Sequence, residues 1–271
     1  ICFSLVKGTL SVVTNSFTHL TALAEGTWHI KVKAFNAAGN ASTFSDNGSV
    51  VIDTTAPALT QVIAVPSPTN NTTPNYTFSS TEGGVITYGG DCSSATTAAT
   101  TGSNTIIFNA LGQGVHSNCT IRVTDSVDNP SNILSVNSFT IDTAAPTVAI
   151  NQALGQADPT NVSPINFTAV FSETVSGFTS RGVTTGGTAG GTKVIAVTGS
   201  GAIYNVAVSS MTDGTVIASI AANAATDAAS NPSTASTSTD NTVTYDATVP
   251  TISTWSIAPE SPAWANNTNP N

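Results

Sequence analysis

Three short polar turns carry many of the chain's candidate ligand groups. They occupy residues 36–40, 125–129 and 227–231, with the sequences NAAGN, DSVDN and DAASN, and they share the pattern [D/N]-x-x-[G/D/S]-N. Carboxylate and amide oxygens are the ligands that Ca²⁺ prefers, and the ion takes six to eight of them. The turns therefore raise a calcium hypothesis.

Further acids lie where apolar segments meet proline. The phrases IDTTAP from Ile52, IDTAAP from Ile141 and YDATVP from Tyr245 each place an acid before a short linker. We expect each polar turn to lie at the same end of its module as an adjoining linker, so that the oxygens converge. The predicted calcium ligands are Asp53, Asp125, Asp128, Asn129, Asp142, Asp227 and Asp246.

A simpler interpretation of the same residues needs no metal. Asp and Asn side chains cap their own turns by accepting hydrogen bonds from nearby backbone N–H groups. This interpretation explains Asn36 in the first turn as well as the acids in the other two. Both interpretations stay open at the level of sequence.

The cysteines predict one disulfide. Cys92 and Cys119 fall within one module, Cys119 points inward on its predicted strand, and the chain has the composition of an exported protein, so we expect these two to be bonded. The pairing state of Cys2 stays open. His116 lies close to Cys119, but zinc needs about four ligands and the segment supplies too few, so no zinc site is predicted.

The sequence shows no recognisable arrangement of catalytic residues. His19, His29 and His116 are scattered and fall in no nucleophile or metalloprotease motif. The glycine-rich GGTAGG at 186–191 lies between predicted strands with no helix after it, which favours a loop over a phosphate cradle. We expect no enzyme activity and no cofactor other than the candidate calcium.

The elements that position these residues are strands. Apolar and polar residues alternate in TWHIKVKAF, NCTIRVTD and TVIASIAA, which directly precede or adjoin the polar turns, and in INFTAVF and NYTF earlier in the modules. The residues expected to face the core are Trp28, Ile30, Val32, Tyr76, Phe78, Cys119, Ile121, Val123, Ile165, Phe167, Ala169, Phe171, Val216, Ala218 and Ile220. Turn clusters between such strands predict an all-β chain of sandwich modules.

The linker phrases divide the chain into modules. Their acids, Asp53, Asp142 and Asp246, lie roughly 90 to 100 residues apart, which is a spacing of domain size. The expected modules are 1–54, the C-terminal part of a module; 55–143, with the disulfide; 144–247; and 248–271, the start of a further module. Proline at 57, 146 and 250 restricts each junction to extended conformations.

Together the turns and linkers resemble a known class of repeats. The pattern of a strand, a D-x-x-G-N turn and a V-D-T-T-A-P junction is similar to the tandem bacterial immunoglobulin-like and fibronectin type III-like repeats of large surface proteins and adhesins. The segment LAEGTWHIKVKAFNAAGNAS is closer to the fibronectin type, and FSETVSGFTSRGVTTGGTAGG to the bacterial immunoglobulin-like type. The resemblance implies the fold more strongly than any single function, and some members of the class use acids near their junctions to bind calcium.

Composition limits the partners. Charged residues make up 8% of the 271 residues, and the net charge is −9, which would repel nucleic-acid phosphates and anionic membranes. No basic-then-apolar signal segment and no membrane-spanning apolar run is present in the sequence. We expect no nucleic-acid partner and no membrane contact in this segment.

Two functions from different classes fit these observations. The first is a structural stalk or spacer in an extracellular, cell-surface protein, adhesin or filament, with neighbouring modules or further copies of the chain as its partners and any host ligand elsewhere. The second is an accessory carbohydrate- or substrate-binding region of a secreted hydrolase. That function needs a row of exposed aromatics, for which only Trp28, Trp255 and Trp264 are available. Trp28 is expected to face the core, and the other two lie in the tail.

Both ends of the sequence suggest continuation. Aligning NAAGN with DSVDN places Cys2 opposite Cys92, so the first module lacks its opening strands. The tail PESPAWANNTNPN resembles PSPTNNTTPN at 66–75, where the second module begins. We therefore expect a longer repetitive chain, or completion of the last module by another copy.

Overall fold

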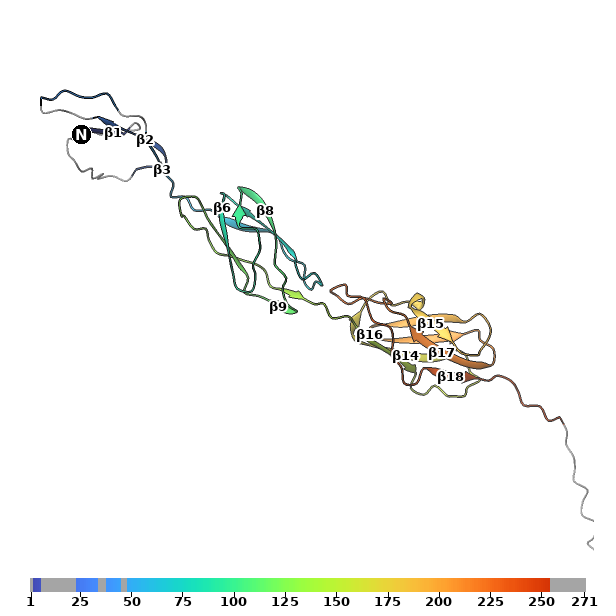
Figure 1. The fold of residues 1–271 in the computed structure, drawn as a ribbon. Helices are drawn as coiled ribbons and strands as arrows, with labels where there is room; N and C mark the ends of the chain where they lie inside the picture. Colours follow the sequence, from blue (N-terminus) through green and yellow to red (C-terminus); the bar gives the residue numbers. More distant parts are fainter. Residues whose placement is uncertain (1, 6–22, 34–37, 45–47, 254–271) are drawn as a thin grey trace, which may run out of the picture. The chain divides into compact units, whose positions relative to one another are not determined.

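The structure is a computed structural model that describes residues 2–5, 23–33, 38–44 and 48–253. Every element of these residues is a strand apart from one short 3₁₀ helix, so the chain is all-β as predicted. It divides into two compact units, Ile1–Thr143 and Ala144–Asn271 (Figure 1). Asn36 and the tail 254–271 lie outside the described residues.

The first unit begins with a small antiparallel sheet. It contains, in the order β1-β2-β3, strands β1 (Cys2–Leu5), β2 (Gly26–Lys33) and β3 (Gly48–Ile52). Trp28 on β2 is 9% exposed, as its inward position in the alternating pattern predicts, and its indole nitrogen donates to Ala24 O at 2.8 Å. Strand β3 carries the apolar part of the first linker phrase and ends one residue before Asp53.

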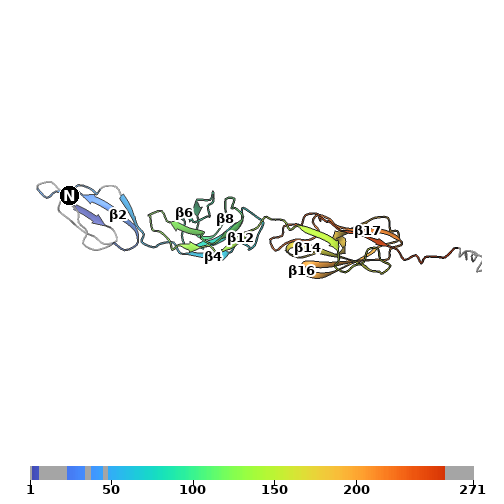
Figure 2. The same ribbon diagram turned by 90° about the horizontal axis from the view of Figure 1, so that it is seen from below.

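Nine further strands of this unit form three antiparallel sheets (Figure 2). The first sheet has the order β4-β5-β8, the second β11-β10-β6-β7 and the third β12-β9. The strands are β4 (Leu59–Ile63), β5 (Asn75–Ser80), β6 (Gly84–Gly89), β7 (Ala98–Ala99), β8 (Gly102–Ile107), β9 (Gly114–His116), β10 (Thr120–Thr124), β11 (Leu134–Ser135) and β12 (Phe139–Ile141).

One core joins these three sheets. Tyr76 and Phe78 on β5 and Ile121 and Val123 on β10 are fully buried, as the sequence predicts, and Phe139 on β12 is buried with them. Strands β9 and β10 are adjacent in sequence but belong to different sheets. Strand β9 pairs with β12, whereas β10 pairs with β6. This segment therefore ties the sheets together around one apolar cluster.

The second unit is likewise built from antiparallel sheets, with longer strands. Its sheets have the orders β13-β14-β16 and β15-β17-β18. The elements are β13 (Val148–Gln152), β14 (Ile165–Val175), η1 (Ser180–Gly182), β15 (Val183–Gly186), β16 (Val194–Ser209), β17 (Gly214–Ile220) and β18 (Thr242–Tyr245).

Its core is filled by alternating residues of facing strands. Ile165, Phe167 and Ala169 on β14 are fully buried, and Val216 and Ala218 on β17 meet them in the same cluster. An aromatic group closes one part of this core: the rings of Phe171, Phe178 and Tyr204 meet edge to face, with centroids 5.1 to 5.8 Å apart. The predicted core positions on β14 and β17 are confirmed.

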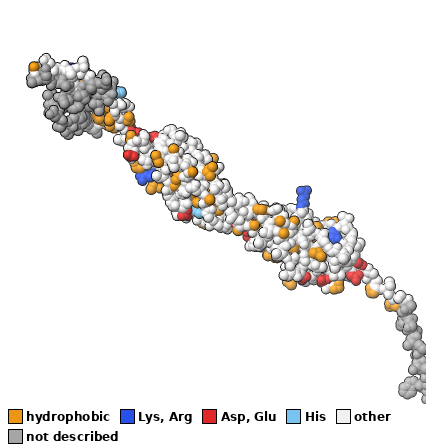
Figure 3. Space-filling view, viewed as in Figure 1, with side chains coloured by type: hydrophobic (Ala, Val, Ile, Leu, Met, Phe, Trp, Pro, Cys, Tyr) orange, Lys and Arg blue, Asp and Glu red, His pale blue; other side chains and the backbone are white. Residues whose placement is uncertain are grey.

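The described surface carries few charges. Figure 3 shows uncharged side chains and backbone over most of the visible face, with isolated acids and very few Lys or Arg. Among the described residues, no helix has the length and hydropathy needed to cross a bilayer.

Candidate metal centre

The turn after β10 is held by its own first residue. Asp125 Oδ1 accepts from the backbone N–H of Val127 at 2.8 Å and of Asn129 at 2.9 Å, and the Asp125 N–H donates to Asn129 O at 3.1 Å. Asp128 has a φ of 68°, the left-handed conformation that lets the chain reverse here. The hydrogen bonds of the capping interpretation are therefore present at this turn.

The turn after β17 repeats the arrangement in the second unit. Asp227 Oδ1 accepts from the backbone N–H of Asn231 at 2.8 Å, and Oδ2 accepts from Asn231 Nδ2 at 2.9 Å. Ser230, with a φ of 70°, takes the place of Asp128. Asp at the first position and Asn at the fifth thus form the same local structure in both units, which explains why the sequence repeats these two residue types.

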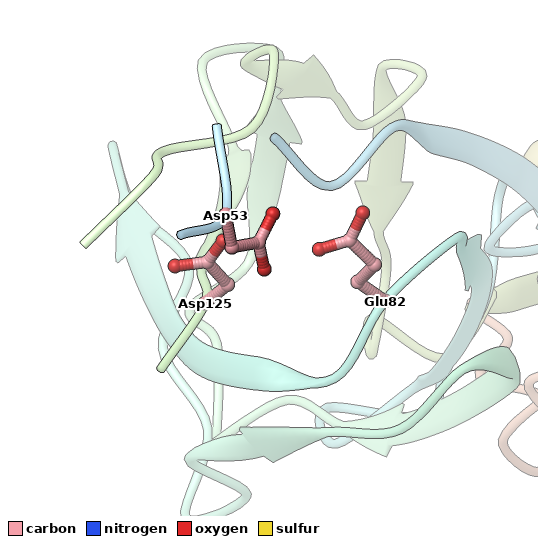
Figure 4. A group of neighbouring side chains, drawn as sticks. All are labelled: Asp53, Glu82 and Asp125. Atoms are coloured by element: carbon pink, nitrogen blue, oxygen red, sulfur yellow. The ribbon is translucent and has the colours of Figure 1, made fainter. Parts of the chain in front are cut away.

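Three carboxylates gather beside the first of these turns. Asp53 follows β3, Glu82 lies in the turn between β5 and β6, and Asp125 follows β10. One ligand oxygen of each lies within 4.8 Å of the other two (Figure 4). Asp125 is buried and the other two are half-buried, so three distant segments of the first unit meet in one acidic group, which we call the Asp53–Glu82–Asp125 cluster.

Within the cluster, the pKa values of Glu82 and Asp125 shift in opposite directions. Burial raises the pKa of Glu82, and the charges of Asp53, Asp125 and Glu25 raise it further. Burial acts in the same direction on Asp125, but the hydrogen bonds from Asn129 and Val127 outweigh it, so the pKa of Asp125 lies below its ordinary value. Repulsion between the carboxylates therefore shows mainly in the raised pKa of Glu82. Three carboxylates this close could be bridged by a hard cation such as Ca²⁺.

Within the first unit, the structure brings together two residues of the predicted ligand set. Asp53 and Asp125 belong to the cluster, whereas Asp128 is exposed at the tip of its turn and stands outside it. Asn129 Nδ2 donates to Asp125 Oδ2 at 2.9 Å and to Asp53 O at 3.0 Å. The assignment of Asp128 and Asn129 as calcium ligands therefore stays a prediction.

The remaining predicted ligands make local contacts of their own. Asp142 Oδ1 accepts from Gln113 Nε2 at 3.3 Å in the first unit. Asp246 Oδ1 accepts from the Thr248 N–H at 3.0 Å in the second unit, to which Asp227 also belongs. The Gln113 contact fastens the middle linker to the first unit, whereas the Asp246 contact lies within the last linker itself.

Sequence reasoning missed Glu82. It lies in the short STEGG segment between two strands, with no resemblance to the repeated turns. Strand β6 pairs with β10 so that Val85 lies opposite Thr124, and this pairing brings the Glu82 turn next to Asp125. The sequence does show an acid in a tight turn before a strand. That signal identifies Glu82 as a site residue only once the pairing of β6 with β10 is known.

The predicted disulfide is confirmed. Cys92 and Cys119 are bonded with a Cα–Cα distance of 5.2 Å, and both are buried in the core of the first unit. Their neighbours also pair: the Asp91 N–H donates to Asn118 Oδ1, and Asn118 Nδ2 donates to Asp91 Oδ1, both at 3.0 Å. Because both sulfurs are in the bond, neither is a thiolate available to a metal.

His116 packs beside the disulfide. Its ring stacks on Phe139 with centroids 5.4 Å apart, and Nε2 lies 2.9 Å from Gly112 O, so Nε2 carries the proton that is donated. Nδ1 lies 3.4 Å from Asp91 Oδ2. These contacts give His116 a packing role between the disulfide and β12.

The chain was also compared with known proteins. Its sequence matches no protein-family model and no curated protein.

Proposed function

We propose that this chain is a structural stalk or spacer segment of a long extracellular bacterial surface protein, adhesin or filament. Its modules would be tandem immunoglobulin-like and fibronectin type III-like sandwiches, as the repeated turns and linker phrases suggest. Antiparallel sheets around an apolar core in each unit support this fold, and a buried disulfide supports an oxidising, extracellular location.

The observation that carries the proposal is the repeated fastening of the linker strand. In the first unit, the Thr69 N–H donates to Thr140 O at 3.0 Å, and the Asp142 N–H donates to Thr69 O at 2.9 Å. In the second unit, the Thr160 N–H donates to Thr244 O and the Asp246 N–H donates to Thr160 O, both at 2.9 Å. Each module thus holds its chain by backbone hydrogen bonds as far as the linker acid.

Such fastening suits a part that spans distance. The segments involved have related sequences, SPTN at 67–70 and DPTN at 158–161, and each forms an isolated parallel bridge with the last strand of its unit. A linker held up to its acid and continued by a nearby proline has few residues left to bend. Repetition of one anchoring arrangement in both units favours a repeated mechanical role over a specialised binding site.

Calcium would add to this role at the first linker. Asp53 belongs to the linker, whereas Glu82 and Asp125 belong to the module that follows, so a bound cation would fix one to the other. The capping hydrogen bonds of the Asp125 turn form without an ion. Calcium is therefore an addition to the stalk proposal and not a condition of it.

The alternative is an accessory carbohydrate- or substrate-binding region of a secreted hydrolase. Sugar binding of this kind uses exposed aromatic faces. Trp28 is buried, Trp255 and Trp264 lie outside the described residues, and Phe44 is the one aromatic in the exposed class among those described. The described part of the chain thus gives this alternative less support.

Labelling of the native source tests the proposal. Antibodies raised against this segment should label intact cells or filaments, and a denaturing gel should show a polypeptide much larger than 271 residues. Sequencing that polypeptide should reveal further copies of the linker phrase. A catalytic hydrolase domain on the same chain, without further copies, would favour the alternative.

A further inference from the structure

A second kind of contact recurs at all three linkers. In each case the strand that pairs with the linker strand is preceded by a polar side chain and opened by glycine: Glu25-Gly26, Gln113-Gly114 and Asp213-Gly214. The antiparallel registers place these glycines opposite the last residue of each linker strand: Ile52, Ile141 and Tyr245. The polar side chain therefore lies beside the linker acid every time.

The glycine is required by its backbone conformation. Gly26, Gly114 and Gly214 have φ values of 124°, 126° and 135°, which L side chains rarely adopt. Around Gly26 and Gly114 there is open space for a Cβ atom, so sterics alone do not demand glycine there. The shared conformation turns the preceding side chain toward the linker.

Glu25 accepts hydrogen bonds from two successive linker residues. Its Oε1 accepts from the Thr54 N–H at 3.2 Å, from Thr54 Oγ1 at 2.6 Å and from Thr55 Oγ1 at 2.8 Å. Asp213 does the same in the second unit: Oδ1 accepts from the Ala247 N–H at 2.8 Å, and Oδ2 accepts from Thr248 Oγ1. Both linkers are held by a carboxylate.

The middle linker is held by an amide instead. Gln113 Oε1 accepts from the Thr143 N–H at 3.1 Å and from Thr143 Oγ1 at 2.7 Å. Its Nε2 donates to Asp142 Oδ1, the acid that precedes the bound threonine. The same backbone group, the N–H after the linker acid, is bound at all three places by side chains of different chemistry.

We propose that Glu25, Gln113 and Asp213 are linker clasps, and that acid opens the clasps of Glu25 and Asp213 while that of Gln113 stays closed. A carboxylate accepts hydrogen bonds more strongly than a neutral carboxyl group, so its protonation weakens the bonds to the linker. An amide does not titrate in this range. The linkers of one chain would then differ in their response to pH.

The pKa directions agree with this geometry. Hydrogen bonds from Thr54 and Thr55 lower the pKa of Glu25 from its ordinary 4.5, and those from Thr248 and Ala247 lower the pKa of Asp213 from 3.8. A lowered pKa in the folded state means that the clasp contributes fully above the ordinary pKa. The contribution is lost as the pH falls through the lower, folded-state pKa.

Other charged groups surround the two carboxylates. Asp53 follows Ile52, which pairs with Gly26 next to Glu25, and Glu25 raises the pKa of Glu82 within the neighbouring Asp53–Glu82–Asp125 cluster. These groups are all acids, so none takes over the role of Glu25 as an acceptor without itself titrating in acid.

Asp213 also has charged groups around it. Asp246 follows Tyr245, which pairs with Gly214 next to Asp213, and Asp158 Oδ1 accepts from the Thr244 N–H of β18. Lys193 is in the loop that lies against Gly214, and its Nζ donates to Ala189 O. The hydrogen bonds to the linker, not an ion pair, are thus the contacts that acid would weaken at Asp213.

Nuclear magnetic resonance of the full 271-residue chain tests the proposal directly. Between pH 7 and pH 3, the amide protons of Thr54 and Ala247 should shift with midpoints below the ordinary pKa values of Glu and Asp, whereas that of Thr143 should not titrate. The Thr55 amide is not a suitable probe, because it donates to Asp53 Oδ1. The amide of buried Phe78 reports whether the unit stays folded.

Matched variants separate the clasps from other acid effects. Glu25→Gln and Asp213→Asn keep an acceptor oxygen and should abolish the titration at Thr54 and Ala247, respectively. Gln113→Glu should introduce a new titration at Thr143. The proposal is overturned if Thr54 still titrates in Glu25→Gln, if wild-type Thr143 titrates like Thr54, or if Phe78 loses its native resonance before Thr54 shifts. None of these readouts depends on whether the chain is a stalk.

Discussion

The disulfide gives a stability prediction whose size follows from the structure. Cys92 and Cys119 are 27 residues apart in sequence, and loop-closure entropy for a loop of that length gives about 3.5 kcal/mol at 25 °C. Both side chains are buried, so the double variant Cys92→Ala/Cys119→Ala also loses some packing. We expect the free energy of unfolding of the disulfide-bearing module to fall by at least this amount.

Hydrogen exchange at buried strands measures the loss. In the double variant, protection of the Phe78 and Val123 amides should fall roughly 300-fold, the equivalent of about 3.5 kcal/mol. Phe167 in the second unit provides the internal control and should keep its wild-type protection. Reduced wild-type protein should behave like the variant. A loss below about tenfold at Phe78, or an equal loss at Phe167, would refute the reasoning.

Three further predictions concern the cluster and the cores. Calcium should raise the melting temperature of wild-type protein but not of Glu82→Gln. Without calcium, Glu82→Gln should be more stable than wild type at neutral pH, because burial and like charges disfavour the Glu82 carboxylate. Identical melting points in calcium and in chelator would end the calcium hypothesis. Phe167→Ala should lower the free energy of unfolding of the second unit by about 3 to 5 kcal/mol, and calorimetry should show the transition of the first unit unchanged; a shift in both would contradict separate cores. Burial raises the pKa of Tyr76 to about 12, so absorbance titration should find a late-ionising tyrosine that is missing in Tyr76→Phe, and stability should fall as the pH rises from about 10 through 12. Ionisation of every tyrosine near pH 10 in folded protein would rule this out.

The sequence was sufficient for strands with a clear period of two. The inward positions of Ile121 and Val123 on β10 and of Phe167 on β14 are confirmed by burial, because alternation along a strand is a local property. The disulfide was predictable for a related reason: Cys119 continues the inward pattern of β10. Capped turns also follow from local residue types, as the hydrogen bonds of Asp125 show.

Long-range pairing set the limit of sequence reasoning. Glu82 meets Asp125 only because β6 pairs with β10, and no local pattern specifies that register. The three clasps escaped notice because Glu25, Gln113 and Asp213 differ in type and share only a following glycine. These three side chains can be found only from the strand registers, which place each of them near a linker acid.

Small-angle X-ray scattering tests the stalk proposal most directly. With stiff linkers, the chain at neutral pH should give the pair-distance distribution of a rod, with a maximum dimension near the sum of module lengths of about 30 to 40 Å each. Inserting a Gly/Ser segment between Thr143 and Ala144 should convert this into the broad distribution of a flexible chain. A compact, globular profile for the wild-type chain, or a profile that the insertion leaves unchanged, would contradict the account.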